Sequence, residues 1–158
     1  MAVPWSEFER AAPELADAGR RRLYHYGPGL AFLATVRKDG GPRVHPVCPT
    51  VFEGRLWVLI GPSLKQHDLR RDPRYALHTF ADADTDDEFY VTGEAIPLVD
   101  DTLRERVRAA MKTDGVSTGD DDALFELTID SVLHSEYEHR GQWPPRYTKW
   151  RAGGNAAG

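Results

Sequence analysis

The sequence predicts a mainly β fold of the α+β type, an antiparallel barrel with peripheral helices. Three observations indicate this class: about six short apolar segments suited to strands, hairpin turns between several of them, and only a few helical stretches. The chain has 158 residues, of which 41% are hydrophobic and 28% charged, as expected for one globular domain with a real core. We expect this domain to span residues 1–152 and the Gly/Ala-rich residues 153–158 to form a flexible tail.

Two helical segments are expected before the first strand. Ser6-Glu7-Phe8-Glu9 has the form of a capping box, in which a serine and a glutamate three residues later satisfy free backbone N–H groups. Pro13 suits the first turn of a second helix, which we expect to continue to about Leu23.

A hairpin follows these helices. Leu30–Val36 is apolar and partly β-branched, which is typical of a buried strand. Lys38-Asp39-Gly40-Gly41 is a strong turn signal. Arg43–Phe52 is expected as the second strand, and Pro46 and Pro49 cannot donate ladder hydrogen bonds. This strand is therefore predicted to be an edge, to contain a bulge, or to line a pocket.

The next segments are a strand and a short basic helix. Arg55–Ile60 is an apolar run, and Gly61-Pro62 breaks it. Ser63 is expected to cap a helix that continues to about Arg71, where Asp72-Pro73 ends it.

The remaining elements are predicted from the same signals. Asp100 or Asp101 should cap a helix that ends near Lys112. Strands are expected at Tyr75–Phe80, Glu88–Val99 and Leu124–Ile129, with Val132–Glu138 extending or following the last of these.

Charge and composition exclude several functional classes. The net charge is -5, with acids gathered in Asp82–Glu88 and Asp120–Asp122, which disfavours a nucleic-acid binder. No run of about 18 apolar residues predicts a membrane span, and no signal peptide is evident. Cys48 is the only cysteine, and the six histidines lack metal-ligand spacing, so no disulfide or metal site is expected. A cytoplasmic location is the simplest expectation.

Three polar residues leave neighbouring turns and could meet at one end of the sheet. Arg43 follows the first hairpin turn, and Ser63 and Lys65 open the basic helix. A helix N-terminus with a serine, a lysine and a nearby arginine suits a phosphate monoester. The alternative is that Ser63 only caps the helix and that Arg43 and Lys65 are solvated. A cation at a helix N-terminus is mildly unfavourable without an anion, which favours the ligand interpretation.

Several segments resemble the pyridoxamine 5'-phosphate oxidase-like flavoproteins in order and spacing. Leu33–Gly40 with Pro42–Val47 looks like the opening hairpin of that family. Ser63-Leu64-Lys65, followed by Asp68–Arg74, resembles the phosphate-loop helix, and Phe89–Ala95 resembles the next strand. The resemblance extends over roughly residues 30–99 and is loose in the last third.

This resemblance implies a split β-barrel homodimer with an FMN in each of two sites at the subunit interface. By position, the basic residues for the phosphate are Arg43 and Lys65, with Ser63 beside them. The resemblance further places other residues near the cofactor: Val44, His45 and Pro46 under the flavin ring, Ile60 and Gly61 at the ribityl-phosphate, and Trp150 close to the flavin of the partner.

Two departures leave the reaction open. Glu88 stands where the vitamin B6 oxidases carry a glutamine, and Tyr147–Ala152 lacks their arginine- and histidine-bearing substrate motif. We therefore expect an FMN-dependent oxidoreductase that exchanges a hydride with a small-molecule substrate, without a predicted catalytic residue. The alternatives are an F420-dependent reductase that uses Arg70, Arg71 and Arg74, or a flavin- or haem-binding protein that is not an enzyme.

Overall fold

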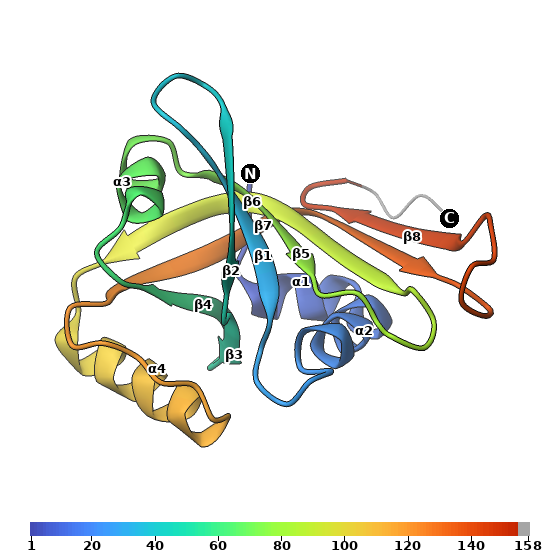
Figure 1. The fold of residues 1–158 in the computed structure, drawn as a ribbon, viewed down its shortest axis with the longest axis horizontal. Coiled ribbons are helices and arrows are strands. Elements are labelled where there is room, and N and C mark those ends of the chain that lie inside the picture. The colour runs from blue at the N-terminus through green and yellow to red at the C-terminus, as the bar shows by residue number, and fades with distance from the viewer. Residues whose placement is uncertain (155–158) are drawn as a thin grey trace.

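The computed structural model describes residues 1–154, in which eight strands and four helices form one β-sheet structure with helices around it (Figure 1). The elements are, in chain order, α1 Trp5–Ala11, α2 Pro13–Leu23, β1 Ala31–Val36, β2 Pro42–Val47, β3 Thr50–Phe52, β4 Arg55–Ile60, α3 Leu64–Arg71, β5 Arg74–Thr79, β6 Glu88–Leu98, α4 Asp101–Thr113, β7 Ala123–Glu136 and β8 Arg146–Arg151.

The strand order shows that the sheet curls into a split barrel. The strands pair antiparallel in the order β2-β1-β5-β6-β7-β4-β3, and β8 pairs with β7. The two end strands of this path, β2 and β3, are joined only by Cys48 and Pro49. Three Cα–Cα steps span at most about 11 Å, so the two ends of the sheet must approach each other at this corner. The predicted antiparallel split barrel with peripheral helices is therefore confirmed.

Two apolar clusters stabilise this arrangement. The main core joins the inner face of the barrel to α1 and α2, through fully buried side chains such as Phe8, Leu33 and Leu77. A second cluster packs Val107 and Met111 of α4 against Trp57 on the other face of β4. Burial of apolar surface supplies most of the driving force for such packing.

Helix α3 lies at one end of the barrel, beside the hairpin of β1 and β2 (Figure 1). The hairpin turn is the one predicted: the Gly40 N–H donates to the Arg37 carbonyl at 2.9 Å, and Gly40 has a positive φ of 84°. This turn requires glycine because other residues rarely adopt such a backbone conformation. The hairpin and α3 together form the region that the sequence singled out for function.

Two local predictions were wrong, and one strand was not predicted. The segment Arg43–Phe52 is not one strand, because the chain turns at Cys48-Pro49 and β3 pairs with β4 rather than β1. Ser6 does not begin a capping box, since α1 begins at Trp5 and the Ser6 N–H donates to the Gly54 carbonyl at 2.7 Å. Strand β8 had no predicted counterpart.

The predicted segments Leu124–Ile129 and Val132–Glu138 belong to one long strand, β7. A shift of register between Thr92 and Gly93 bends the pairing of β6 with β7. A Cβ at Gly93 would lie 1.8 Å from the Thr128 carbonyl oxygen, so only glycine permits this close approach.

The predicted cap of α4 is confirmed at Asp100, whose Oδ1 accepts a hydrogen bond of 2.9 Å from the Leu103 N–H. Among residues 1–154, no helix is both long and apolar enough to cross a membrane. Residues 155–158 of the predicted flexible tail lie outside the described residues.

Candidate functional site

Arg43 faces α3 from the second strand. Cross-strand partners share one face of a sheet, and Arg43 pairs with the buried Thr35 of β1. From this position the Arg43 Nε donates to Oδ2 of Asp68 in α3 at 2.7 Å. The arginine predicted to bind phosphate is therefore in an ion pair, and 22% of its side chain is exposed.

Asp68 is the centre of this contact network. Only 3% of the residue is exposed. Besides Arg43, it accepts a hydrogen bond from the Thr35 hydroxyl at 3.0 Å and from Arg71 Nη2 at 3.3 Å. Burial alone would raise the pKa of this carboxyl, but the hydrogen bonds from Arg43, Thr35 and Arg71 outweigh it and lower the pKa. Asp68 is therefore ionised at neutral pH.

A cleft of about 620 Å³ opens between this network and the hairpin turn. We call it the cationic cleft, because four cations and two carboxylates line it, a surplus of two positive charges. Such a surface attracts a compact anion. Its lining residues are Arg37, Lys38, Asp39, Arg43, Leu64, His67, Asp68 and Arg71.

Ser63 and Lys65 do not line this cleft, but they lie at the adjoining helix start. Ser63 precedes α3 with an extended backbone, and its side chain makes no capping hydrogen bond. The Ser63 Oγ is buried and has no hydrogen-bond partner within residues 1–154. The predicted serine cap is thus correct in its position but not in its side chain, and in the described chain the first N–H groups of the helix receive no capping hydrogen bond from Ser63.

Lys65 lies in the first turn of α3, three residues before Asp68. Residues at this spacing occupy neighbouring positions on a helix, so Lys65 precedes Asp68 by about one turn on α3. Within the described chain, Lys65 is in no ion pair, whereas Arg43 and Arg71 both contact Asp68. An oxyanion at the start of α3 would meet the free helix N–H groups, the Ser63 hydroxyl and the Lys65 ammonium group.

Ile60 and Gly61 lie at the end of β4. The Ile60 side chain is buried in the main core, and its carbonyl accepts a hydrogen bond of 3.0 Å from Gln66 Nε2. Gly61 is half-buried, and a Cβ added there would lie 3.2 Å from Asp122 Oδ1. Because Ile60 is only 1% exposed, the accessible part of this strand end is Gly61.

Val44, His45 and Pro46 are exposed on β2, which has one free edge because it pairs only with β1 in the described chain. Val44 and Pro46 lie on the outer face, opposite Ala34 and Phe32 of β1. His45 is on the other face, like Arg43. The three residues thus present a strand edge and an apolar outer face to a ligand or a second protein.

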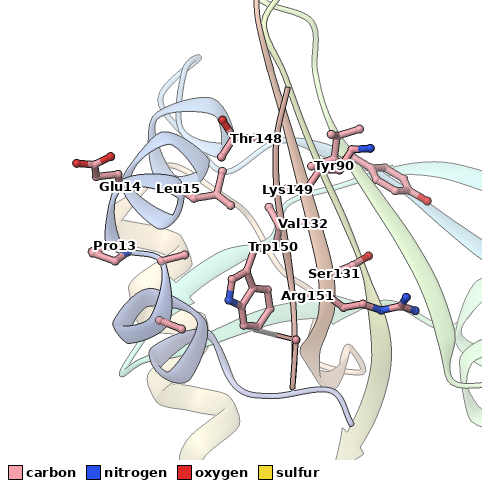
Figure 2. A pocket seen from close by; sticks show the side chains of 14 residues that line it. Pro13, Glu14, Leu15, Tyr90, Ser131, Val132, Thr148, Lys149, Trp150 and Arg151 are labelled. Atoms are coloured by element: carbon pink, nitrogen blue, oxygen red, sulfur yellow. The ribbon is translucent and has the colours of Figure 1, made fainter. Parts of the chain in front are cut away.

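Trp150 lies apart from the other predicted residues. Its ring packs against Phe8 of α1 with a centroid distance of 5.0 Å. It lines a separate cavity of about 830 Å³ along β8. Figure 2 shows Trp150 and Leu15 on one side of this strand and Tyr90 and Arg151 on the other. This cavity shares no lining residue with the cationic cleft.

Sequence reasoning missed the residues that hold Arg43 in place. Thr35 and Asp68 were noted only as members of the family-like segments, and Arg71 was singled out only for the F420 alternative. One signal was available: Asp68 is an acid within a basic helix, at the 3-to-4-residue spacing that joins it to Leu64, Lys65 and Arg71. Such an acid must find a cationic partner if its position is buried.

Comparison with protein families agrees with this architecture. A family model described as pyridoxamine 5'-phosphate oxidase matches residues 21–135, well over half of the chain. The chain belongs to the pyridoxamine 5'-phosphate oxidase-like family. The predicted family resemblance is thereby confirmed, and the match includes the hairpin, α3 and β5 to β7 but not Trp150. The family contains oxidoreductases and haem-binding proteins, and its members bind flavin or haem.

Solved structures share the fold at low sequence identity. A Clostridium acetobutylicum protein related to general stress protein 26, of the pyridoxinephosphate oxidase family, is 12% identical with a TM-score of 0.64, over 88% of this chain and 94% of that chain. A haem storage protein from Vibrio cholerae is 22% identical with a TM-score of 0.58, over 75% of this chain and 89% of that chain.

A haem-binding protein from Mycobacterium smegmatis is 19% identical with a TM-score of 0.60. The match includes 85% of this chain and 57% of that protein, so this chain spans little more than half of its length. A comparison with curated protein sequences finds no match.

Proposed function

We propose that the protein binds FMN and acts as an oxidoreductase on a small molecule. One observation carries the cofactor assignment: the start of α3 combines a buried, unpartnered Ser63 hydroxyl with an unpaired Lys65 in the described chain. Buried polar groups in native proteins almost always have a partner, so an orphaned hydroxyl at a helix N-terminus indicates a ligand. A phosphate monoester supplies the acceptor oxygens and the negative charge that this position lacks.

The residues around α3 would divide the work of holding the phosphate. Lys65 supplies a mobile positive charge, the helix N–H groups supply fixed donors, and the Ser63 hydroxyl donates a hydrogen bond. Arg43 contributes charge from the side of β2, where Asp68 holds it. Together these groups bind and orient one end of the cofactor.

The outer face of β2 supports a homodimer as part of the proposal. Val44 is 58% exposed, and Phe32 is 42% exposed and stacked on Phe80 with a centroid distance of 4.5 Å. With Pro46 they form an apolar patch beside a free strand edge, a surface that a second copy of this chain would cover. The flavin ring would then lie along Val44–Pro46 at the interface, within reach of Trp150 of the second copy.

Bound FMN supplies a ring that accepts or donates a hydride, and the protein supplies binding and orientation. In this proposal the strand edge of β2 orients the ring, and the apolar patch excludes water from it once the second copy is bound. A cytoplasmic location belongs to the same proposal, since a single cysteine suits a reducing compartment.

The binding test compares FMN with riboflavin, which has the same ring but no phosphate. We expect FMN to bind more tightly, and Lys65→Ala to weaken FMN binding about 10- to 150-fold, the effect of losing a hydrogen bond to a charged group. Lys112→Ala, which changes an exposed lysine of α4, is the matched control. Equal affinity of FMN for the wild type and Lys65→Ala would contradict the proposed phosphate site.

A haem carrier is the second candidate, because His67 lines the cationic cleft between cations that could bind propionate groups. Haemin bound with a His67-dependent absorbance band, in the absence of FMN binding, would favour this function.

The third candidate is an F420-dependent reductase, in which Arg70, Arg71 and Arg74 together would have to bind the cofactor. Arg71 lines the cleft, but Arg70 lies over the Phe125 ring and Arg74 is paired with Asp72. F420 bound much more tightly than FMN would replace the proposed cofactor.

A further inference from the structure

Two of the three arginines that line the cationic cleft bind the same buried carboxylate. Arg43 comes from β2 and Arg71 from the last turn of α3, and each binds a different oxygen of Asp68. Thr35 of β1 donates to the same oxygen as Arg43. Asp68 therefore ties two strands to the helix at the edge of the proposed phosphate site.

The contact leaves most donors of Arg43 free. A guanidinium group carries five N–H donors, and within residues 1–154 the Arg43 side chain uses only Nε for a hydrogen bond. Both terminal nitrogens therefore remain available to a ligand in the cationic cleft. An unanchored arginine would lose many rotamers on binding an anion, whereas one held at Nε is already restricted.

The burial of Asp68 makes this arrangement rigid. A carboxylate that is 3% exposed has no water to replace a missing protein donor. Thr35, which is also 3% exposed, fixes the position of the oxygen that Arg43 binds. The carboxylate is thus held from β1 and α3, and its position sets that of the Arg43 guanidinium group.

We propose that Asp68 is the positioning residue of the phosphate-binding end: it holds Arg43 and Arg71 so that their free N–H groups face the cleft and select ligands that carry a phosphate. This inference rests on the proposed FMN site and deepens it. Asp68 does not touch the phosphate itself, because a carboxylate repels it, and it acts only through the two arginines.

Positioning and simple electrostatics predict opposite effects of removing Asp68. Replacement by alanine deletes one negative charge and raises the net positive charge of the cleft. If charge alone mattered, the preference for FMN over riboflavin would increase. If Asp68 positions the arginines, the preference decreases despite the added positive charge, because Arg43 loses its only hydrogen-bond partner in residues 1–154 and Arg71 keeps only its hydrogen bond to the Val36 carbonyl.

The experiment measures the dissociation constants of FMN and riboflavin by flavin fluorescence for the wild type and for Asp68→Ala. The ratio of the riboflavin constant to the FMN constant measures how much the phosphate contributes to binding. A general loss of folding would weaken the binding of both ligands equally and leave this ratio unchanged. We expect the ratio to fall about tenfold or more in Asp68→Ala. An unchanged or increased ratio would overturn the positioning role.

A second variant covers the case in which Asp68→Ala does not fold. Thr35→Val keeps every charge and nearly the same shape but removes the hydroxyl that orients Asp68. We expect a several-fold decrease in the preference for FMN over riboflavin, in keeping with the loss of one hydrogen bond to a charged group. No change in this variant, with Thr35 buried against Asp68, would also overturn the proposal.

A measurement without flavin separates this inference from the proposed function. In ¹⁵N NMR spectra of the ligand-free protein, the Arg43 Nε–H should exchange slowly in the wild type and rapidly in Thr35→Val. If the wild type binds no FMN, the proposed function fails, and this exchange rate still tests whether Asp68 holds Arg43. Rapid exchange in the wild type would overturn the positioning role.

Discussion

Replacing Arg43 by alanine tests whether the ion pair with Asp68 also stabilises the fold. Removing one partner of a fully buried pair costs about 3–5 kcal/mol because the other charge stays buried and unpaired. Here the Arg43 side chain is 22% exposed, and Asp68 keeps its contacts with Thr35 and Arg71. We therefore expect a smaller loss of about 1.5–3 kcal/mol in the free energy of unfolding, the range for a hydrogen bond to a charged group.

Urea denaturation followed by tryptophan fluorescence measures this loss, and a thermal scan should show a Tm lower by about 4–10 °C for a chain of this size. In the background of Asp68→Asn, no buried negative charge is left unpaired, so Arg43→Ala should cost less than about 1 kcal/mol. Lys65→Ala is the control and should change stability by less than about 0.5 kcal/mol. An equal cost of Arg43→Ala in both backgrounds would refute the coupling.

The remaining predictions concern packing, pH and assembly. Gly19→Ala would place a Cβ 2.4 Å from Phe89 Cζ, so overpacking of about 1–3 kcal/mol should exceed the gain in helix propensity, and urea denaturation should show a net loss of stability. Burial lowers the pKa of His134 below its ordinary 6.5, so the unfolded chain binds the proton first, and stability should decrease as pH falls below 6.5, with a slope of at most about 1.4 kcal/mol per pH unit. The same titration of His134→Gln should be flatter, and an equal slope would contradict this assignment. Val44→Asp should convert a dimer to a monomer in light scattering while the control Val99→Asp, at a fully exposed valine, does not, and a dimer in both would place the interface elsewhere.

Turns and single elements could be predicted because their signals are local. Gly40 adopts the positive φ that glycine allows, in the hairpin turn that Lys38–Gly41 indicates, and Asp100 caps α4 as its position before the helix indicates. Strand β8 was missed for the opposite reason. Its side chains are largely exposed, so no apolar alternation marks it, and pairing with β7 alone defines it.

In the candidate site too, features with a local signal could be predicted and contacts between distant residues could not. The sequence predicted that Arg43 and Lys65 lie near the start of one helix, and the structure pairs Arg43 with Asp68 of α3 and has Lys65 in the first turn of that helix. The ion pair itself depends on a contact between residues 25 positions apart, which no local pattern encodes. Ser63 illustrates a further limit, since a serine before a helix is typical of a cap, although its hydroxyl here is buried and has no hydrogen-bond partner among residues 1–154.

The most direct test of the proposed function is the absorbance spectrum of the purified protein after excess FMN has been added and then removed. We predict the bands of oxidised flavin, retained at about one FMN per chain, and loss of most of this flavin in Lys65→Ala under the same washing. A colourless protein, or one that retains haemin or F420 but not FMN, would contradict the proposal that the start of α3 binds the phosphate of FMN.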